Sequence, residues 1–213
     1  MKKSLPSYLK KTLIYNASKE INSENYKYIN SFLKDKNKDV RFEALDALNL
    51  HFGKYFKKED IQFLVNDKYA KITTKAIYIL STQFKVKSST LHRKALKFLY
   101  QSDELLVTDM LEVLHDYTNY LTPSDIKPAL KSKSGLIRSY AMALYGNLPN
   151  TKKDILKILR TERSSQVKMA AYQALYSQGE EEYMQKLIDL MLTTKQYRVR
   201  SACVKTIYSL VNK

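Results

Sequence analysis

The sequence predicts an all-α fold made of stacked helix pairs, and three observations support this. A short signature recurs six times at a spacing of about 32 residues. Gly and Pro number only four each, which favours helices with short connections over strands and tight turns. Hydrophobic residues make up 44% of the chain, enough for a continuous core. A fixed period of this size marks an architecture in which each repeat packs against its neighbours.

The signature consists of an apolar residue, an often basic residue, two variable residues and a small or apolar residue, then two more variable residues and one or two apolar residues. Its copies begin at Val40, Ile72, Leu106, Ile137, Val167 and Val199. Apolar residues at i, i+4, i+7 and i+8 share one helix face, so each copy predicts the second helix of a pair. The second residue of each copy is called position two below, and it is Arg41, Thr73, Val107, Arg138, Lys168 or Arg200.

A shorter amphipathic stretch precedes each signature and predicts the first helix of the pair. These stretches lie at residues 26–33, 61–65, 91–99, 126–130, 155–159 and 184–191. Capping residues mark helix starts at 88–89, 122–125 and 150–151, with a proline in the first turn of the second of these. Residues 5–20 predict one more helix. We therefore expect a single domain over 1–213, with an N-terminal capping helix in 1–21, six pairs in 22–213 and about 13 helices in all.

The signature resembles the HEAT repeat, specifically its short bacterial type, over about residues 22–213. The pattern Val/Ile-Arg/Lys-x-x-Ala-x-x-Ala/Leu carries the resemblance, most clearly in the copies that begin at Val40, Ile137, Val167 and Val199. The period is shorter than the roughly 40 residues of long HEAT units. The Trp-x-x-Leu-Gly and Thr-Pro-Leu-His motifs of other helical repeats are absent. The resemblance implies a right-handed α-solenoid with the second helices on its concave side, and it implies no particular activity.

Charge is the main compositional clue to function. Lys and Arg number 37 against 21 Asp and Glu, for a net charge of +16. This balance favours acidic partners, which include nucleic acid, an acidic protein face or an anionic membrane. It does not choose among them, and the oligomeric state stays open.

The compartment is predicted from what the sequence lacks. No apolar run reaches about 18 residues, so no membrane span is expected. Lys10 and Lys11 interrupt the start of the chain, which argues against a signal peptide. The one cysteine, Cys203, allows no disulfide framework and is interpreted as a buried packing thiol. A soluble, cytoplasmic protein is expected.

Basic residues at position two form the first candidate site, which comprises Arg41, Arg138, Lys168 and Arg200. In HEAT-like stacks this residue commonly pairs with a neighbouring acid and forms a ladder between repeats, and Asp39 fits as a partner of Arg41. We favour this structural ladder. Contact with a partner molecule is the alternative. Both can hold, because a chain with few acids leaves some guanidinium donors free.

The turns between the two helices of each pair carry a second basic series: Lys34, Lys36, Lys38, Lys68, Lys71, Lys131, Lys133, Arg160, Arg163, Lys195 and Arg198. Stacking would align equivalent turns along one edge, interrupted in the third repeat by Asp103 and Glu104. These lysines and arginines are either ordinary solvated turn residues or an edge that tracks phosphates or binds acidic groups. The candidates in repeats four to six are Lys131, Lys133, Arg160, Arg163, Lys195 and Arg198.

Tyrosines form a third candidate group. The chain has 17, and three of them, Tyr145, Tyr176 and Tyr208, recur near the ends of second helices. We expect them to fill the edge of the core and to donate hydrogen bonds outward. The alternative is stacking on bases or anchoring an interface.

Enzyme chemistry finds little support. The three histidines show no metal-ligand spacing, and no His-Glu pair of the HEAT-like di-iron hydroxylases occurs. HEAT-like alkylpurine DNA glycosylases use tryptophans and a catalytic aspartate, but Trp is absent, and Asp46, Asp109 and Asp116 are only weak candidates. We expect no catalytic residue, metal or cofactor. The sequence therefore predicts a binding or adaptor module for an acidic protein or peptide, with a nucleic-acid-binding protein as the alternative.

Overall fold

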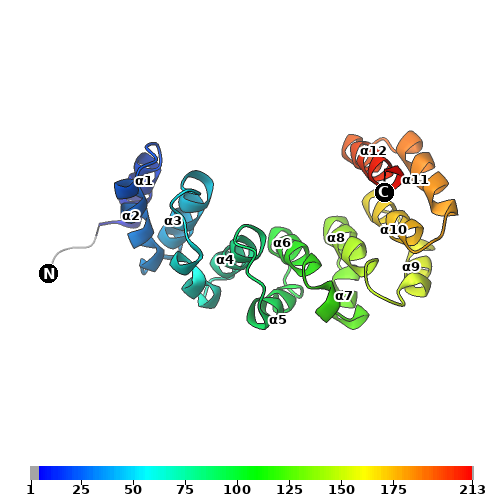
Figure 1. Cartoon of the computed structure of the whole chain (residues 1–213), viewed down its shortest axis with the longest axis horizontal. Coiled ribbons are helices and arrows are strands. Elements are labelled where there is room, and N and C mark those ends of the chain that lie inside the picture. The colour runs from blue at the N-terminus through cyan, green and yellow to red at the C-terminus, as the bar shows by residue number, and fades with distance from the viewer. Residues whose placement is uncertain (1–4, 213) are drawn as a thin grey trace. The chain divides into compact units, whose positions relative to one another are not determined.

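The chain is all-helical in a computed structural model that describes residues 5–212 (Figure 1). Within this range there are twelve α-helices, four short 3-10 helices and no strand, which confirms the predicted fold class at that level. The chain divides into two compact units, Met1–Arg93 and Lys94–Lys213, and each is described by itself. The right-handed solenoid and the single domain stay predictions.

The first unit contains signature helices that pack on one another. Its helices are α1 (Ser7–Ala17), α2 (Ser23–Ser31), η1 (Phe32–Lys34), α3 (Lys38–His51), η2 (Lys58–Asp60), η3 (Gln62–Asn66) and α4 (Ala70–Thr82), and the unit boundary falls within α5 (Ser89–Phe98). The signature helix α3 contacts α4, and the shorter α2 packs on α3.

One expected helix in this unit is not an α-helix. Residues 61–65 lie in η3, directly after η2. Ile61 separates the two 3-10 segments with φ −122° and ψ −7°, outside helical geometry. The whole stretch between Phe56 and Asp67 is short, and runs of this length commonly close with i→i+3 hydrogen bonds. The predicted apolar residues are still buried, since Ile61, Leu64 and Val65 are all at most 8% exposed.

The N-terminal helix differs from a simple cap. Helix α1 contacts α3 as one signature helix contacts the next, and Lys10 Nζ lies 2.5 Å from Asp35 Oδ2 in the turn before α3. Lys10 therefore stands where Arg41 stands one repeat later. Residues 1–4 of the predicted capping segment lie outside the described residues.

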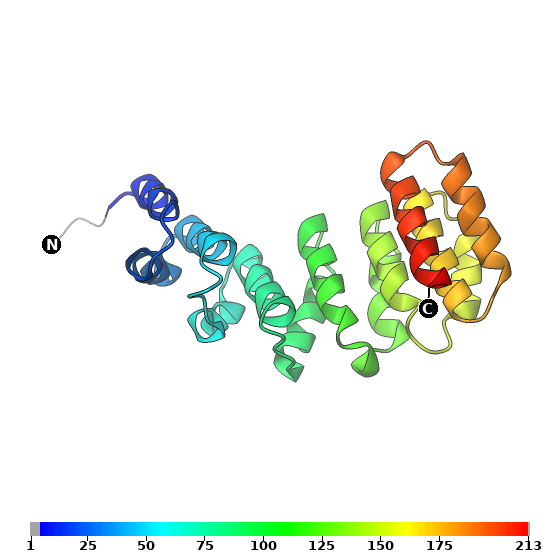
Figure 2. The ribbon, with the colours of Figure 1, turned by 45° about the horizontal axis from the view of Figure 1, so that its top comes forward.

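The second unit contains η4 (Thr118–Tyr120) and the helices α6 (Glu104–His115), α7 (Pro123–Leu130), α8 (Gly135–Tyr145), α9 (Lys152–Leu159), α10 (Ser165–Ser177), α11 (Glu182–Thr193) and α12 (Tyr197–Val211). Signature helices contact in succession, α6 with α8, α8 with α10, and α10 with α12. Helices α7, α9 and α11 each pack on the signature helix that follows them, and Figure 2 shows α11 and α12 side by side.

Helix starts agree with the capping residues in the sequence. Helix α5 begins at Ser89, where Ser88 Oγ accepts a hydrogen bond from the Leu91 N–H. Thr122 and Asp125 form a capping box at the start of α7, and Thr151 is the residue just before α9.

Small residues of the signature allow close helix packing. Ala44, Ala141 and Ala171 are fully buried, as predicted, and Cys203 at the equivalent place in α12 is buried too. The end of α8 approaches α10 closely, because a Cβ added to Gly146 would sit 2.2 Å from the Ala174 Cβ. Side chains thus set the spacing between successive signature helices in the second unit.

Candidate partner-binding surface

Position two carries an ion pair between successive repeats of the first unit. Arg41 Nε and Nη2 donate to the two carboxylate oxygens of Asp67 at 2.7 and 2.9 Å. Its Nη1 donates to the backbone carbonyls of Asp35 and Lys36 at 2.7 and 3.1 Å. Burial alone would raise the pKa of the Asp67 carboxyl. The Arg41 guanidinium and the Tyr69 N–H outweigh burial and hold that pKa below its usual range.

The same geometry recurs in the second unit. Arg138 Nε and Nη2 donate to Glu162, each at 2.9 Å. Its Nη1 donates to the carbonyls of Ser132 and Lys133 at 2.9 and 3.0 Å. Hydrogen bonds from Arg138 hold the pKa of Glu162 below its usual range, against the opposing effect of burial. Two arginines in one register thus make the same bidentate pair, the strong form of a charge-assisted hydrogen bond.

The carboxylates in these pairs occupy a fixed place in the repeat. Asp35, Asp67 and Glu162 each lie three residues before the start of a signature helix. The expected pairing of Arg41 with Asp39 is therefore wrong. Residues two apart on a helix point to different sides, so Asp39 cannot reach the Arg41 guanidinium, whereas the turn that follows can.

Position two lacks this ion pair in the other copies. Thr73 instead donates its hydroxyl to the Asp67 carbonyl at 2.7 Å, and Val107 is buried. Lys168 is half-buried and Arg200 is exposed, and their side chains make no ion pair within residues 5–212. The turn that follows Lys168 has Thr194 where Glu162 stands one repeat earlier, so the carboxylate is missing there.

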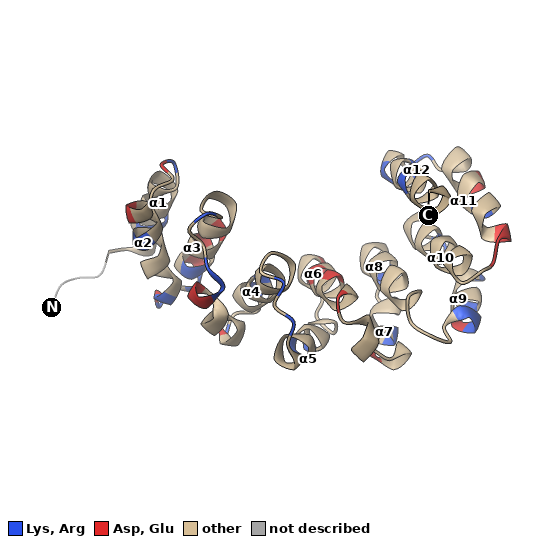
Figure 3. Cartoon of the chain, in the orientation of Figure 1, with Lys and Arg blue, Asp and Glu red and all other residues tan. Residues whose placement is uncertain are grey.

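The basic residues in the turns of repeats four to six have no ion-pair partner among the described residues. All six candidates are exposed and make no ion pair in the described chain, namely Lys131, Lys133, Arg160, Arg163, Lys195 and Arg198. Arg138 joins two of these turns, because it binds the Ser132 and Lys133 carbonyls as well as Glu162. The third turn precedes α12, which contacts α10. Figure 3 shows the Lys and Arg positions along both units.

Turn cations of the first unit have a different environment. Lys38, Lys68 and the Arg41 guanidinium all lie over the Tyr69 ring, 4.9 to 5.4 Å from its centroid. Lys34 lies 5.6 Å from the Phe63 ring centroid. These cation–π contacts already occupy part of the cationic surface. Among the predicted turn cations of the first unit, Lys36 and Lys71 are exposed and make no such contact in the described residues.

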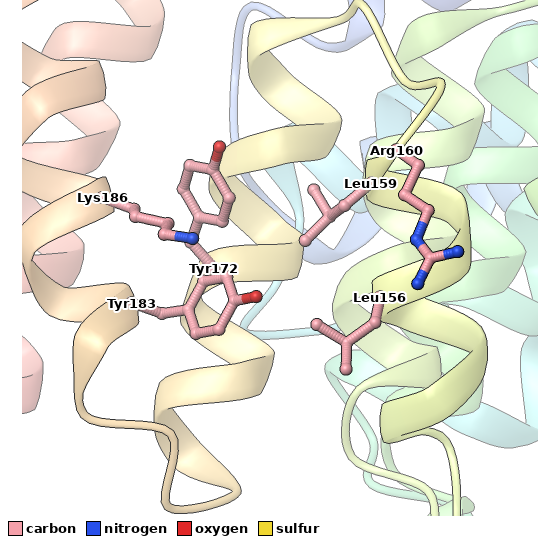
Figure 4. Close-up of a pocket in the computed structure, with 6 residues that line it drawn as sticks. All are labelled: Leu156, Leu159, Arg160, Tyr172, Tyr183 and Lys186. Atoms are coloured by element: carbon pink, nitrogen blue, oxygen red, sulfur yellow. The ribbon is translucent and has the colours of Figure 1, made fainter.

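A pocket of about 330 Å³ opens between α9, α10 and α11 (Figure 4). Leu156, Leu159 and Arg160 line one side of it, opposite Tyr172, Tyr183 and Lys186. The two tyrosine rings lie 5.6 Å apart, and Lys186 Nζ is 4.6 Å from the Tyr183 ring centroid. The combination of an apolar wall and two cations suits an apolar side chain next to a carboxylate.

Sequence patterns did not indicate this pocket. Arg160 is the one residue in it that was a candidate, because it belongs to the turn series. Tyr172 follows the small residue Ala171, and Tyr183 and Lys186 lie on a first helix. Their convergence depends on the packing of three helices, which residue spacing alone does not specify.

The tyrosines near the ends of the second helices differ in their surroundings. Tyr145 is fully buried and donates from its hydroxyl to Asp154 at 2.6 Å, which matches the expected core-edge role. Burial raises the pKa of Tyr145 strongly, with the Asp154 carboxylate adding to the effect. Tyr176 is half-buried and Tyr208 is exposed.

Potential metal ligands are dispersed over residues 5–212. No cluster of three or more His, Cys, Asp or Glu side chains in this range is arranged to hold a metal ion. Of the weak glycosylase candidates, Asp46 pairs with Lys75 at 2.9 Å.

No helix within residues 5–212 combines the length and the apolar character that a membrane span requires. Neither protein-family models nor curated proteins match this chain.

Proposed function

We propose that this chain is a non-enzymatic, HEAT-like binding or adaptor module that acts in the cytoplasm and captures an acidic protein or peptide. The turn surface of the second unit supplies the contacts, and it consists of Lys131, Lys133, Arg160, Arg163, Lys195 and Arg198. One observation carries the proposal. The acid of these turns, Glu162, is bound by Arg138, while the six exposed cations have no acid of their own.

In this proposal the paired Arg138 and the exposed turn cations have different roles. A bidentate, mostly buried pair stabilises the contact between α8 and α10 and has little capacity left for a ligand. Exposed cations without an ion-pair partner retain a positive electrostatic potential around them. This potential attracts an acidic surface and orients its approach. The pocket that Arg160 and Lys186 border adds a place for an apolar anchor beside a carboxylate.

Salt and nuclease separate this function from nucleic-acid binding. The full-length chain is immobilised and exposed to lysate with and without nuclease, and captured proteins are then challenged with poly-L-glutamate and with unrelated DNA duplexes. Capture of an acidic protein partner should persist after nuclease treatment, and it should resist competition by other polyanions at moderate salt. Sequence-independent DNA binding that falls steeply with salt would instead establish the nucleic-acid alternative.

A further inference from the structure

The pocket between α9, α10 and α11 contains a hydroxyl that lacks a hydrogen bond. Tyr183 is only 6% exposed, and its ring contacts the Tyr172 ring and Lys186 Nζ. Its hydroxyl makes no hydrogen bond to the described residues 5–212. Figure 4 shows the Tyr183 side chain extending from α11 across the pocket toward Leu156 on α9. Buried tyrosine hydroxyls usually have a hydrogen-bond partner, so this one is available to an oxygen atom of a ligand.

Arg160 gives the same pocket a cation that is available to a ligand. It is exposed, and its guanidinium makes no ion pair or hydrogen bond in the described chain. Lys186 is already engaged, because its Nζ lies 3.5 Å from Glu182 Oε1 and 4.6 Å from the Tyr183 ring centroid. Arg160 and the Tyr183 hydroxyl are thus two donors without an acceptor at one pocket. A carboxylate has two accepting oxygens and can satisfy both.

The rest of the pocket is apolar and small. Leu156, Leu159 and the Tyr172 ring line it. Its volume of about 330 Å³ lies at the lower end of the range for ligand sites, roughly 300–1,000 Å³. The pocket therefore has room for one large apolar side chain and the group that carries the carboxylate, but not for a longer segment.

Stereochemistry selects the source of the carboxylate. Successive side chains of an extended peptide point to opposite sides, so an acid next to an apolar residue would point away from the pocket. Asp and Glu carry a carboxylate themselves, but their short methylene chains cannot cover both leucines. The C-terminal residue of a chain has an apolar side chain and a free α-carboxylate on the same Cα. Among peptide groups, it matches the pocket best.

We propose that this pocket binds the C-terminal residue of the acidic partner, and that this residue is large and apolar, such as Leu or Phe. Its α-carboxylate accepts hydrogen bonds from the Arg160 guanidinium and the Tyr183 hydroxyl. Its side chain covers Leu156, Leu159 and the Tyr172 ring. This inference rests on the proposed function, because it identifies one segment of the acidic partner.

The test selects binders without assuming their sequence. Random, acid-rich peptides are displayed with a free C-terminus and panned on the full-length chain. Each enriched peptide is then synthesised as the free acid, as the C-terminal amide, and as the free acid extended by one glycine. The glycine extension keeps the charge of the carboxylate but moves it away from the last apolar side chain.

Fluorescence anisotropy gives the dissociation constant of each peptide form for the wild type, Arg160→Gln, Tyr183→Phe and the control Arg163→Gln. The control removes a turn cation that does not line the pocket. Thermal melting checks that each variant is folded. Tyr183→Phe should melt no lower than the wild type, because its hydroxyl has no hydrogen bond to lose in the free chain.

The expected result is enrichment of large apolar residues at the last position of the peptide. For the wild type, the amide and the glycine-extended form should bind about ten-fold more weakly than the free acid, because charge-assisted hydrogen bonds are lost. Arg160→Gln should remove most of that difference, and Tyr183→Phe should reduce it by about three-fold. Arg163→Gln should weaken all three forms equally and leave their ratio unchanged.

Two results would overturn the inference. One is a selection without preference at the last position, and the other is an amide and a glycine-extended form that bind the wild type as tightly as the free acid. The proposed function is judged separately by lysate capture with Arg163→Gln combined with Arg198→Gln. Capture of an acidic protein that depends on those two arginines but not on Tyr183 would refute only the pocket inference. Selective binding of free C-termini that Tyr183→Phe weakens, with capture unaffected by the double variant, would support the pocket and count against the turn surface.

Discussion

Arg138 and Glu162 are 24 residues apart in sequence, and their side chains form a bidentate pair with two N–O distances of 2.9 Å. The pair joins α8 to the turn before α10, while Arg138 also binds two carbonyls of its own preceding turn. One side chain therefore fixes two consecutive turns. Arg41 does the same with Asp67 in the first unit, so the pairing recurs in the same register in two of the six copies.

Removing Arg138 should destabilise the fold. In Arg138→Met, Glu162 keeps its largely buried carboxylate but loses two charge-assisted hydrogen bonds, so the free energy of unfolding should fall by about 1–3 kcal/mol. Lys168→Met is the matched control, because Lys168 has the same position in the repeat but no ion pair in the described chain, and it should change stability by less than about 0.5 kcal/mol. Urea unfolding followed by circular dichroism measures both. Equal losses would refute the structural role of the pair.

The same pair predicts a pH dependence. The pKa of Glu162 is lower in the folded chain than its ordinary value of 4.5, so the unfolded state binds more protons in the window just below that value. The contribution of the Glu162 carboxylate to the free energy of unfolding is therefore fully present above about pH 4.5. It is lost as the pH falls through the pKa that Glu162 has in the folded chain. Urea midpoints from pH 6 down to pH 3 should fall less steeply for Glu162→Gln than for the wild type. Lys168→Met should keep the wild-type slope, and an unchanged slope in Glu162→Gln would contradict the assignment.

Gly146 should tolerate no side chain. A Cβ there would lie 2.2 Å from the Ala174 Cβ and 3.3 Å from its Cα, so Gly146→Ala should push α8 and α10 apart and cost about 1–3 kcal/mol. Gly53→Ala is the control, because nothing lies within 4 Å of the added methyl. Combining Gly146→Ala with Ala174→Gly should recover part of the loss in a double-mutant cycle. Purely additive losses would show that the two residues do not touch.

Hydrophobic periodicity was sufficient to predict most of the fold. Each signature became an α-helix, and Ala44, Ala141 and Ala171 are buried where the small position of the signature required it. Periodicity reports which residues share a face, and that was enough for the signature helices and also for the eight-residue helices α7 and α9. It failed at residues 61–65, which close as a 3-10 helix after the non-helical backbone of Ile61 and bury the same residues.

The carboxylate partners carried a signal that the sequence interpretation missed. Asp35, Asp67 and Glu162 stand six residues before a position two, and each follows a repeat whose own equivalent residue is basic: Lys10, Arg41 and Arg138 respectively. That co-occurrence is visible in the printed sequence. The acid nearest to Arg41 in the chain is Asp39, but it lies on the same helix as Arg41 and points to a different side. The pocket beside Tyr172 had no such signal, since three separate helices create it.

Reversing charges on the turn surface should slow capture of the partner without affecting the fold. Arg163 and Arg198 are exposed and make no ion pair in the described residues, so Arg163→Glu combined with Arg198→Glu should leave the melting temperature nearly unchanged. Adjacent turns lie about one helix-packing distance apart, roughly 10 Å, which is close to the Debye length at about 0.1 M salt. Their charges therefore act as a steering field with several weak contacts.

The association rate constant for the captured acidic partner should fall by about ten-fold at low salt, while the dissociation rate constant changes much less. The matched control is Lys27→Glu combined with Lys205→Glu, which changes the net charge equally at exposed residues away from these turns. Stopped-flow fluorescence at several salt concentrations distinguishes the two double variants. The effect of a local electrostatic field on the association rate constant disappears as salt rises, whereas the effect of a lost contact does not.

If both double variants slow association equally, the total charge of the chain drives the encounter and the turns have no special part in it. If the turn variant unfolds more readily while Arg138→Met affects only binding, the roles assigned to the turn row and the ion-pair row are reversed.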